Sequence, residues 1–233
     1  MIKHIPNTLT LLNLIAGFAA IIYAINGYNE YAAFCIMAGM VFDFSDGFAA
    51  RLLKAYSPLG KDLDSLADMV TFGVAPGAIV INLLLGAGLG TVAAFGIAAL
   101  IPAASALRLA RFNNDSTQAT SFRGLATPAS AFTVISVVLA SSYTDFKLPD
   151  TLAGSALFIS ILSLFLSVMM LANLRMFSLK LSHVRWKGNE ERYIFAGSCL
   201  LLLFFLRMAA TPLFMASYII ISLVSAGFRS RKA

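Results

Sequence analysis

The chain has 233 residues, of which 59% are apolar and only 12% are charged, and its net charge is +6. An ordinary soluble domain is about 25% charged, so this composition excludes a disordered protein and argues against a soluble one. The mean hydropathy of +0.84 indicates that most of the chain lies in a membrane. A spanning helix needs about 20 mostly apolar residues, which leaves room for roughly six to eight spans.

Long apolar segments follow one another along the whole chain. Their apolar runs are continuous and do not alternate, which predicts helices and not a closed barrel. Turn residues such as Asn26-Gly27 and Ser57-Pro58 separate them. The expected spans are residues 6–26, 31–53, 61–86, 91–112, 127–144, 151–173, 192–208 and 212–228. We therefore expect an all-α integral membrane protein, a bundle of about eight transmembrane helices that forms one domain over residues 1–233.

The basic residues predict how this bundle lies in the membrane. With eight spans, all of the 17 Lys and Arg residues except Lys147 and Arg207 fall on one side. Cytoplasmic loops carry an excess of Lys and Arg, so we expect a multi-pass protein of the cell membrane with both termini in the cytoplasm. A basic face beside a membrane is more commonly attracted to anionic lipid head groups than to nucleic acid. We expect the lipid bilayer as a partner and no nucleic acid.

The acidic residues gather in one predicted hairpin. Five of the 11 lie between Asp43 and Asp68. A carboxylate in a membrane helix costs at least a few kcal/mol, so it is a functional candidate by default. Asp43 and Asp46 are three residues apart, and Asp64 and Asp68 are four apart, which places each pair on one helix face. The turn at residues 57–60 makes the two helices antiparallel neighbours, so all four carboxylates can meet.

Four facing carboxylates repel one another unless they take up protons or bind cations. A ligand set made only of oxygen atoms favours a hard ion, Mg²⁺ first and then Mn²⁺ or Ca²⁺. Two such ions that share carboxylates form the clamp used in phosphoryl transfer. The small residues Gly47, Ala49 and Ala50 leave backbone exposed, so that a bulky substrate can approach closely. The hairpin therefore predicts a site for Mg²⁺ or Mn²⁺ that acts on a phosphate ester.

The spacing within the hairpin also forms a longer motif, Asp-x2-Asp-Gly-x2-Ala-Arg-x8-Gly-x3-Asp-x3-Asp. Its fixed positions are Asp43, Asp46, Gly47, Ala50, Arg51, Gly60, Asp64 and Asp68. This motif resembles the signature of the CDP-alcohol phosphatidyltransferase family, with no departure at any position. The resemblance implies an integral membrane enzyme, a homodimer with its site facing the cytoplasm. Such enzymes move a phosphatidyl group from a CDP-linked lipid to an alcohol and release CMP.

The resemblance also implies roles for single residues. The four aspartates Asp43, Asp46, Asp64 and Asp68 would ligate one or two divalent ions, and Asp68 would also take the proton of the acceptor hydroxyl. The CDP-lipid would lie against the following residues: Asn7, Thr10, Gly47, Ala50, Arg51 and Gly60. For Asn7 a helix N-cap is an equally good interpretation. Asp62 is outside the motif, and we interpret it as a solvated carboxylate.

A second resemblance concerns the acceptor. Four segments resemble the membrane-embedded phosphatidylserine synthases of bacteria and archaea: residues 6–17, 64–76, 105–114 and 122–128. The third includes Arg108-Leu-Ala-Arg111-Phe112-Asn113. The likeness covers most of residues 5–130 and departs at Ala126, where a proline is expected. The substrates would then be CDP-diacylglycerol and L-serine, whose carboxylate needs a basic and preferably bidentate partner. The candidate acceptor-binding residues are Arg108, Arg111, Asn113, Arg123 and Thr127.

Several alternatives stay open. A phosphorylated acceptor, glycerol 3-phosphate or inositol phosphate, needs the same arginines, and a hydrolase would replace the alcohol by water. An ion-coupled transporter also uses intramembrane aspartates, but here they gather in a single hairpin and no inverted repeat is visible. Gly73 and Gly77 form a GxxxG pattern, which allows close helix packing either within the chain or between two copies.

Overall fold

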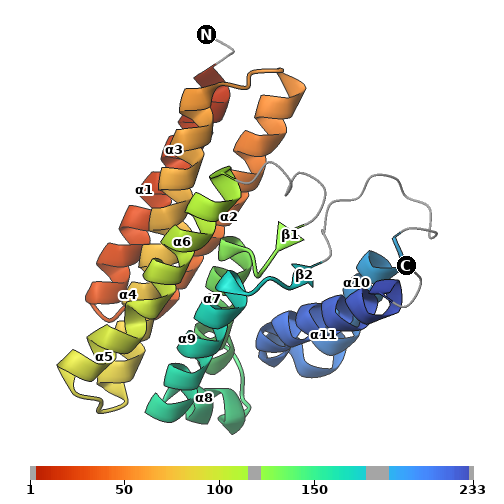
Figure 1. The fold of residues 1–233 in the computed structure, drawn as a ribbon. Helices are drawn as coiled ribbons and strands as arrows, with labels where there is room; N and C mark the ends of the chain where they lie inside the picture. The colour runs from red at the N-terminus through yellow and green to blue at the C-terminus, as the bar shows by residue number, and fades with distance from the viewer. Residues whose placement is uncertain (1–3, 115–121, 177–188, 231–233) are drawn as a thin grey trace.

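The structure is a computed structural model that describes residues 4–114, 122–176 and 189–230. Almost all of this part is helical (Figure 1), as predicted. The elements of its first half are α1 (Ile5–Ile25), α2 (Asn29–Leu52), α3 (Pro58–Asp68), the π-helix η2 (Met69–Val74), α4 (Ala75–Gly86), α5 (Thr91–Ala98) and α6 (Leu100–Asn114). The second half contains β1 (Phe122–Arg123), α7 (Thr127–Ser142), α8 (Lys147–Ala153), α9 (Ala156–Leu171), β2 (Arg175–Met176), α10 (Glu190–Leu206), η4 (Arg207–Ala210) and α11 (Thr211–Ser230).

Some of the basic residues behind the predicted orientation lie outside the described residues. They are Lys3, Lys180, Arg185, Lys187, Arg231 and Lys232.

Within the described ranges, five helical segments are long and apolar enough to cross a membrane. They are residues 5–25, 29–52, 58–86, 91–114 and 190–222. A sixth is formed only if α8 and α9 are taken together. These two helices are bent by 76°, and the break follows Ala153, where Gly154 and Ser155 interrupt the helix. The predicted continuous span at 151–173 is therefore wrong, and α7 is apolar but has only 16 residues. By length and composition, the described residues provide five to six spans, which reaches the lower end of the predicted six to eight.

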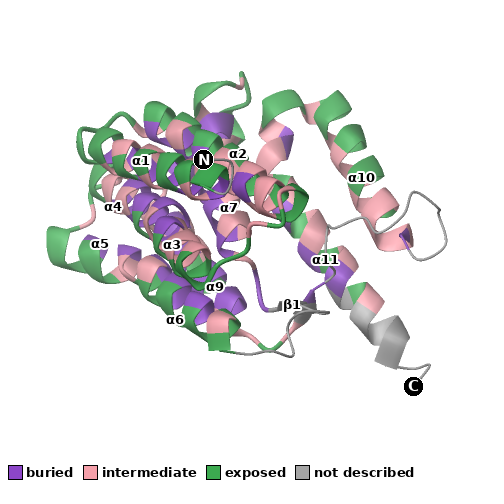
Figure 2. Cartoon of the chain, turned by 90° about the horizontal axis from the view of Figure 1, so that it is seen from above, coloured by how far each residue is buried: buried purple, intermediate pink, exposed green. Residues whose placement is uncertain are grey.

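The outer surface of the bundle is apolar. Phe18, Phe95 and Val92 are among the large apolar side chains that are mostly exposed. Buried residues line the faces between the helices, whereas exposed residues lie around the outside (Figure 2). Soluble monomers rarely expose so much contiguous apolar surface, so the outside of this bundle is suited to lipid. The described structure thus agrees with the membrane protein that the composition predicts.

The GxxxG pattern packs within the chain. A Cβ atom added at Gly73 would lie 3.0 Å from the Ser105 Cβ atom, and one added at Gly77 would lie 3.1 Å from Pro102 Cδ. Both neighbours belong to α6, which packs against η2 and α4. These glycines therefore serve the contact of two helices in one chain, and they provide no argument for a homodimer.

A short antiparallel pairing of β1 with β2 joins the segment before α7 to the segment after α9. Next to it, the backbone N–H of Gly124 donates to the Leu174 carbonyl over 2.9 Å, and the N–H of Leu125 donates to the Met169 carbonyl over 2.9 Å. Gly124 has a φ of +74°, which only glycine adopts without strain. This joint fixes the start of α7, where one predicted acceptor residue, Thr127, lies.

We expect Gly124→Ala to destabilise the protein by about 3 kcal/mol, because left-handed strain adds to overpacking. The new Cβ atom would lie 2.5 Å from the Met170 carbonyl oxygen. Gly88→Ala is the matched control, since Gly88 has a φ of +82° and no atom within 4 Å of its added Cβ. Thermal unfolding in detergent measures both. Equal losses for the two variants would show that the crowding at Gly124 has no effect on stability.

Candidate active site

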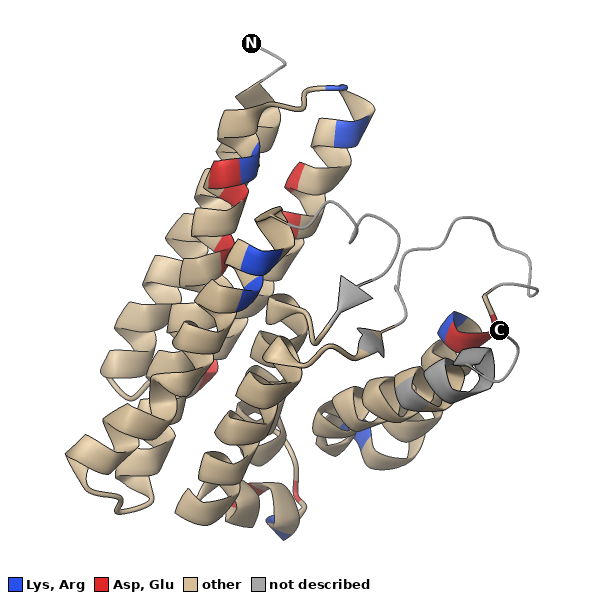
Figure 3. Ribbon diagram, viewed as in Figure 1, with Lys and Arg blue, Asp and Glu red and all other residues tan. Residues whose placement is uncertain are grey.

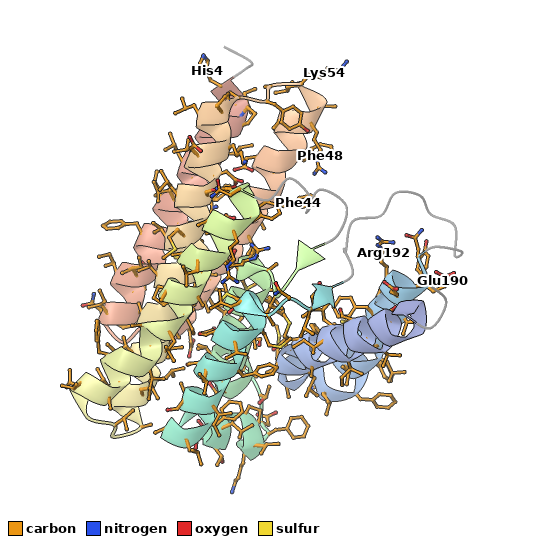
Figure 4. The ribbon with its side chains drawn as sticks, in the orientation of Figure 1. His4, Phe44, Phe48, Lys54, Glu190 and Arg192 are labelled. Carbon is orange, nitrogen blue, oxygen red and sulfur yellow. The ribbon has the colours of Figure 1, made fainter. Side chains whose placement is uncertain are left out.

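The hairpin of α2 and α3 is built as its sequence predicts. Helix α2 ends at Leu52, and Lys54 adopts a left-handed φ of 48° as the chain turns. Helix α3 begins at Pro58. Ser57 is its N-cap, and the Ser57 hydroxyl accepts a hydrogen bond of 3.0 Å from the Gly60 N–H. A serine N-cap followed by proline is a strong signal for a helix start. The turn lies at one end of the bundle, where Figure 4 shows Lys54.

Three of the four predicted metal ligands come together. Asp43 from α2 and Asp64 and Asp68 from α3 each offer a carboxylate oxygen, and these three oxygen atoms lie within 4.8 Å of one another. Asp64 Oδ1 is buried and has no hydrogen-bond partner among the described residues. A buried carboxylate oxygen without a donor, beside two further carboxylates, is suited to a divalent cation with oxygen ligands.

The fourth carboxylate, Asp46, lies beside this group but is held differently. It is only 5% exposed, and its Oδ2 atom accepts a hydrogen bond of 2.6 Å from the Thr10 hydroxyl of α1. It remains close enough to Asp43, Asp64 and Asp68 for electrostatic repulsion. The structure therefore places Thr10 next to the carboxylate cluster.

Asn13 is a site residue that our predicted set leaves out. It is fully buried in α1, and its Nδ2 atom donates to Asp68 Oδ1 over 3.3 Å. The π-helix η2 begins directly after Asp68, and there the Thr71 hydroxyl donates to the backbone carbonyl of Asn13 over 2.9 Å. Single π-turns inside helices occur frequently at functional sites. Asn13 and Thr71 thus orient the last aspartate of the motif.

A cavity of about 460 Å³ opens beside the aspartates. Asp46 and Asp64 line it, and so does the Gly47 backbone, whose added Cβ atom would meet no atom within 4 Å. All residues predicted to contact the CDP-lipid belong to its wall: Asn7, Thr10, Gly47, Ala50, Arg51 and Gly60. Residues that are far apart in the sequence therefore line one cavity, and the carboxylates of Asp46 and Asp64 form part of its wall.

Three residues that are not part of the motif also line this cavity: Tyr56, Lys61 and Phe112. Two of the three have aromatic side chains. The Lys61 ammonium donates to the Asn113 carbonyl over 3.0 Å, which ties α3 to α6. Acidic and basic residues lie together at this end of the bundle, whereas few lie at the opposite end (Figure 3). A hollow with both signs of charge is suited to a phosphate ester that is bound with a cation.

The predicted acceptor residues do not form a single group. Arg108 is only 8% exposed and donates to the Thr127 hydroxyl over 3.3 Å. Arg111 is exposed and donates to the Leu171 carbonyl over 3.3 Å. The Asn113 amide donates to the Ser65 hydroxyl over 2.7 Å. The backbone of Arg123 lies in β1, and its side chain is outside the described part. Arg108 and Thr127 are therefore the pair that lies inside the protein.

Comparisons with known proteins show which proteins this chain is similar to. The family model of CDP-alcohol phosphatidyltransferase matches residues 3–179. A CDP-diacylglycerol--serine O-phosphatidyltransferase of Helicobacter pylori is 32% identical over 221 residues, which is 94% of this chain and 89% of that protein. The Bacillus subtilis protein of the same name is 35% identical over 63% of this chain and 80% of its own length. An archaetidylserine synthase of Methanothermobacter thermautotrophicus is 30% identical over 61% of each chain.

The family match includes the whole carboxylate hairpin and the cavity beside it. The Helicobacter pylori relative extends the similarity over nearly the whole chain. Three of the four motif aspartates meet, and the family model matches residues 3–179. The chain therefore belongs to the CDP-alcohol phosphatidyltransferase family and is an enzyme of that family.

Proposed function

We propose that the protein transfers the phosphatidyl group of CDP-diacylglycerol to the hydroxyl of L-serine, which gives phosphatidylserine and CMP. One observation carries this proposal. Three carboxylate oxygens within 4.8 Å lie beside a cavity that all of the predicted donor-binding residues line. Such a site joins a place for a divalent cation to a place for a nucleotide-linked phosphate.

The residues present fit Mg²⁺ or Mn²⁺. Asp43, Asp64 and Asp68 would supply its ligands, and Asp46 would act as a fourth ligand or hold the cluster from the side. A bound cation would neutralise the charge that develops on the phosphate oxygens and on the departing CMP. The unpartnered Asp64 Oδ1 is the atom that such an ion would satisfy.

The protein's own groups would then perform the transfer. The serine hydroxyl oxygen attacks the phosphorus next to diacylglycerol, a new P–O bond forms, and the P–O bond to CMP breaks. Asp68 takes the hydroxyl proton, and the Asn13 amide keeps Oδ1 of that carboxylate turned toward α1. Gly47 and Ala50 allow the donor to approach α2 closely, with Arg51 and Asn7 along the same wall. Positioning and charge neutralisation provide most of the rate enhancement.

An anionic acceptor is favoured by Arg108. Its guanidinium is buried near Asp68, and Thr127 accepts one of its hydrogen bonds. A buried guanidinium is a good partner for a carboxylate, which it binds through two parallel hydrogen bonds. Glycerol 3-phosphate would satisfy the same cation. The names of the relatives favour serine, because several are CDP-diacylglycerol--serine O-phosphatidyltransferases.

The site would face the cytoplasm. The hairpin turn carries Arg51, Lys54 and Lys61, and basic loops lie on the cytoplasmic side of membrane proteins. CDP-diacylglycerol would enter the site from the bilayer. The protein would lie in the cell membrane, and it would form a homodimer. The homodimer is inferred from the family resemblance alone.

A panel of acceptors tests the proposed function. CMP release is measured for purified protein in detergent with CDP-diacylglycerol and either Mg²⁺ or Mn²⁺. The acceptor is L-serine, glycerol 3-phosphate, inositol phosphate or none. The proposal expects release that depends on both the metal and serine. Release with another acceptor would overturn serine specificity, and release without any acceptor would indicate a hydrolase.

The hydrogen bond from Thr10 to Asp46 gives a further prediction. Thr10→Val is expected to lower kcat/KM about tenfold, because a valine of similar shape leaves a buried carboxylate without its 2.6 Å donor. Thr10→Ser keeps the hydroxyl and should stay within about threefold of the wild type. Initial rates of CMP release measure both. If valine and serine have the same effect, the hydrogen bond has no part in catalysis.

A further inference from the structure

A second cavity, of about 230 Å³, lies in the other half of the chain. We call it the α8 cavity, and its walls come from α7, α8, α9, the end of α10, η4 and the start of α11. None of the described residues that line it has a polar side chain. An apolar cavity of about 150 Å³ stays dry in water and takes up benzene, so this larger one is suited to hydrocarbon.

The α8 cavity has a buried floor and an exposed mouth. Val137 and Ala140 of α7 form its floor and are 5% and 0% exposed. Phe146, Leu148 and Leu213 also line it, but they are 53%, 67% and 41% exposed. The cavity therefore opens to the outside of the bundle, where the apolar surface is suited to lipid.

Two interruptions of the helices leave this space between them. Helix α8 is bent by 76° from α9, and the chain between α10 and α11 turns at Arg207, whose φ is 50°. The walls are nevertheless fixed to one another. The Thr211 hydroxyl donates to the Ser136 carbonyl of α7 over 3.3 Å, and the rings of Phe132 and Phe214 stack with their centres 6.5 Å apart. The start of α11 is thus attached to α7 beside the cavity.

Charged residues adjoin the mouth of the α8 cavity. Lys147 and Arg207 are exposed, and each is next in the sequence to a residue that lines the cavity. They are also the two basic residues that the predicted orientation places on the side away from all the others. Asp145 and Asp150 are exposed in the same segment as Lys147, so the mouth carries both signs of charge. Cations above an apolar cavity are complementary to a lipid phosphate above its acyl chain.

The mouth also has the composition of a membrane interface. Tyr143, which follows α7, is 50% exposed, and tyrosine is enriched where the hydrocarbon core meets the head groups. Figure 1 shows α8 at the end of the bundle opposite the turn between α2 and α3. The α8 cavity is therefore separate from the cavity that Asp46 and Asp64 line, and it lies at the level of the other leaflet.

We propose that the α8 cavity binds one acyl chain of a phospholipid from the leaflet at the α8 end of the bundle. The phosphate of this lipid lies at the mouth, where Lys147 and Arg207 supply positive charge. Burial of the chain against the α7 floor removes apolar surface of the protein from contact with head groups and water. The proposal does not depend on the proposed function, because none of its tests measures CMP release.

A phosphatidylglycerol that carries a diazirine in one acyl chain is the probe. The purified full chain is placed in phosphatidylethanolamine and phosphatidylglycerol vesicles with this probe and illuminated, and labelled peptides are identified by mass spectrometry. We expect residues 137–152 and 206–213 to be labelled at least about fourfold more than residues 91–98 of the exposed helix α5, the effect of burying one further methylene group. Equal labelling of both would show only general contact with lipid and would overturn the proposal.

A variant that fills the cavity is the second arm. Ala209 lines the cavity, and Ala209→Phe should lower the labelling about tenfold by keeping roughly two methylene groups out. Ala93→Phe is the matched control, because Ala93 is exposed on α5 and outside the cavity. It should leave the labelling within about twofold. If Ala209→Phe elutes as an aggregate, Ala209→Leu takes its place, with an expected loss of about fourfold. Unchanged labelling in a folded cavity variant would overturn the proposal.

Two further arms separate a phospholipid from other occupants. Lys147→Gln with Arg207→Gln should lower labelling by the phospholipid probe about fivefold or more, and labelling by an uncharged diazirine alkanol should not change. If the alkanol labels the wild-type cavity as strongly as the phospholipid does, the assignment to a phospholipid is wrong. Leu148→Cys protein that forms disulfide-linked dimers in these vesicles, where the wild type forms none, would show that a second copy covers the mouth. That result would also overturn the proposal.

Discussion

Asp68→Asn is expected to reduce the rate of CMP release about 10³-fold or more, because the change removes both a general base and a metal-ligating charge. Asparagine has nearly the same shape and keeps the hydrogen bond from Asn13, so the fold should be preserved. The rate is measured at saturating serine and CDP-diacylglycerol over a range of Mn²⁺ concentrations. Gel filtration in detergent confirms that the variant is folded.

Asp62→Asn is the matched control for this variant. Asp62 lies on α3, two residues before Asp64, but it is exposed and belongs to neither the carboxylate cluster nor the cavity wall. Its replacement should change the rate less than about twofold, since exposed charges contribute little. Asp43→Asn and Asp64→Asn should resemble Asp68→Asn in weakening Mn²⁺ binding. A folded Asp68→Asn protein with more than a tenth of the wild-type rate would contradict the role of this residue.

Gly17→Ala is expected to prevent stable folding, with a loss of about 3 kcal/mol or more from overpacking. An added Cβ atom at Gly17 would lie 2.7 Å from the Thr71 Cα atom, which is backbone and cannot turn aside. Thr71 is fully buried and is inserted between α1 and α2 at the π-helix. Thermal unfolding and the yield of monodisperse protein measure the effect. Gly96→Ala in α5 is the control, because nothing lies within 4 Å of its added Cβ.

Gly39 of α2 lies on the opposite side of Thr71 from Gly17. A second substitution at Thr71 can therefore test whether Thr71 causes the crowding at Gly39. A Cβ atom there would lie 2.5 Å from Thr71 Cγ2 and 2.9 Å from Asn13 Oδ1. Thr71→Ser removes the crowded methyl group but keeps the hydroxyl that donates to Asn13. It should therefore restore part of the stability of Gly39→Ala and none of that of Gly17→Ala. No rescue of Gly39→Ala would show that the Thr71 methyl group is not what requires a glycine at this position.

The hairpin and the meeting of three of its aspartates could be predicted because they depend on local signals. The spacing of Asp43, Asp46, Asp64 and Asp68 follows helix periodicity, and the Ser57 cap with Pro58 marks the turn. The motif residues Gly47, Ala50, Arg51 and Gly60 line one cavity. That the CDP-lipid binds in this cavity stays a prediction. The sequence predicts four equivalent aspartate ligands, but Asp46 differs from the other three. One of its carboxylate oxygens accepts a hydrogen bond from the Thr10 hydroxyl.

Other parts depend on contacts between distant segments, which no periodicity reveals. Asn13 reaches Asp68 across 55 positions of the sequence, and only the packing of α1 against α3 and η2 brings them together. The π-helix has no strong sequence signal, although Gly17 and Gly39 provide the space that it needs. The interruption at Gly154 was missed because hydropathy averages over a window and does not see a single break. Helix α11 lies in a part of the chain for which the motif gives no information.

The most direct test of the central claim follows both products of one reaction. Purified protein is incubated with CDP-diacylglycerol, Mn²⁺ and isotopically labelled L-serine, and the label extracted into lipid is compared with the CMP released. We expect equal amounts of labelled lipid and CMP, and no detectable amount of either with Asp68→Asn or with a chelator. CMP without labelled lipid would show that water and not serine is the acceptor. No CMP from folded, metal-loaded protein would contradict phosphatidyl transfer by this site.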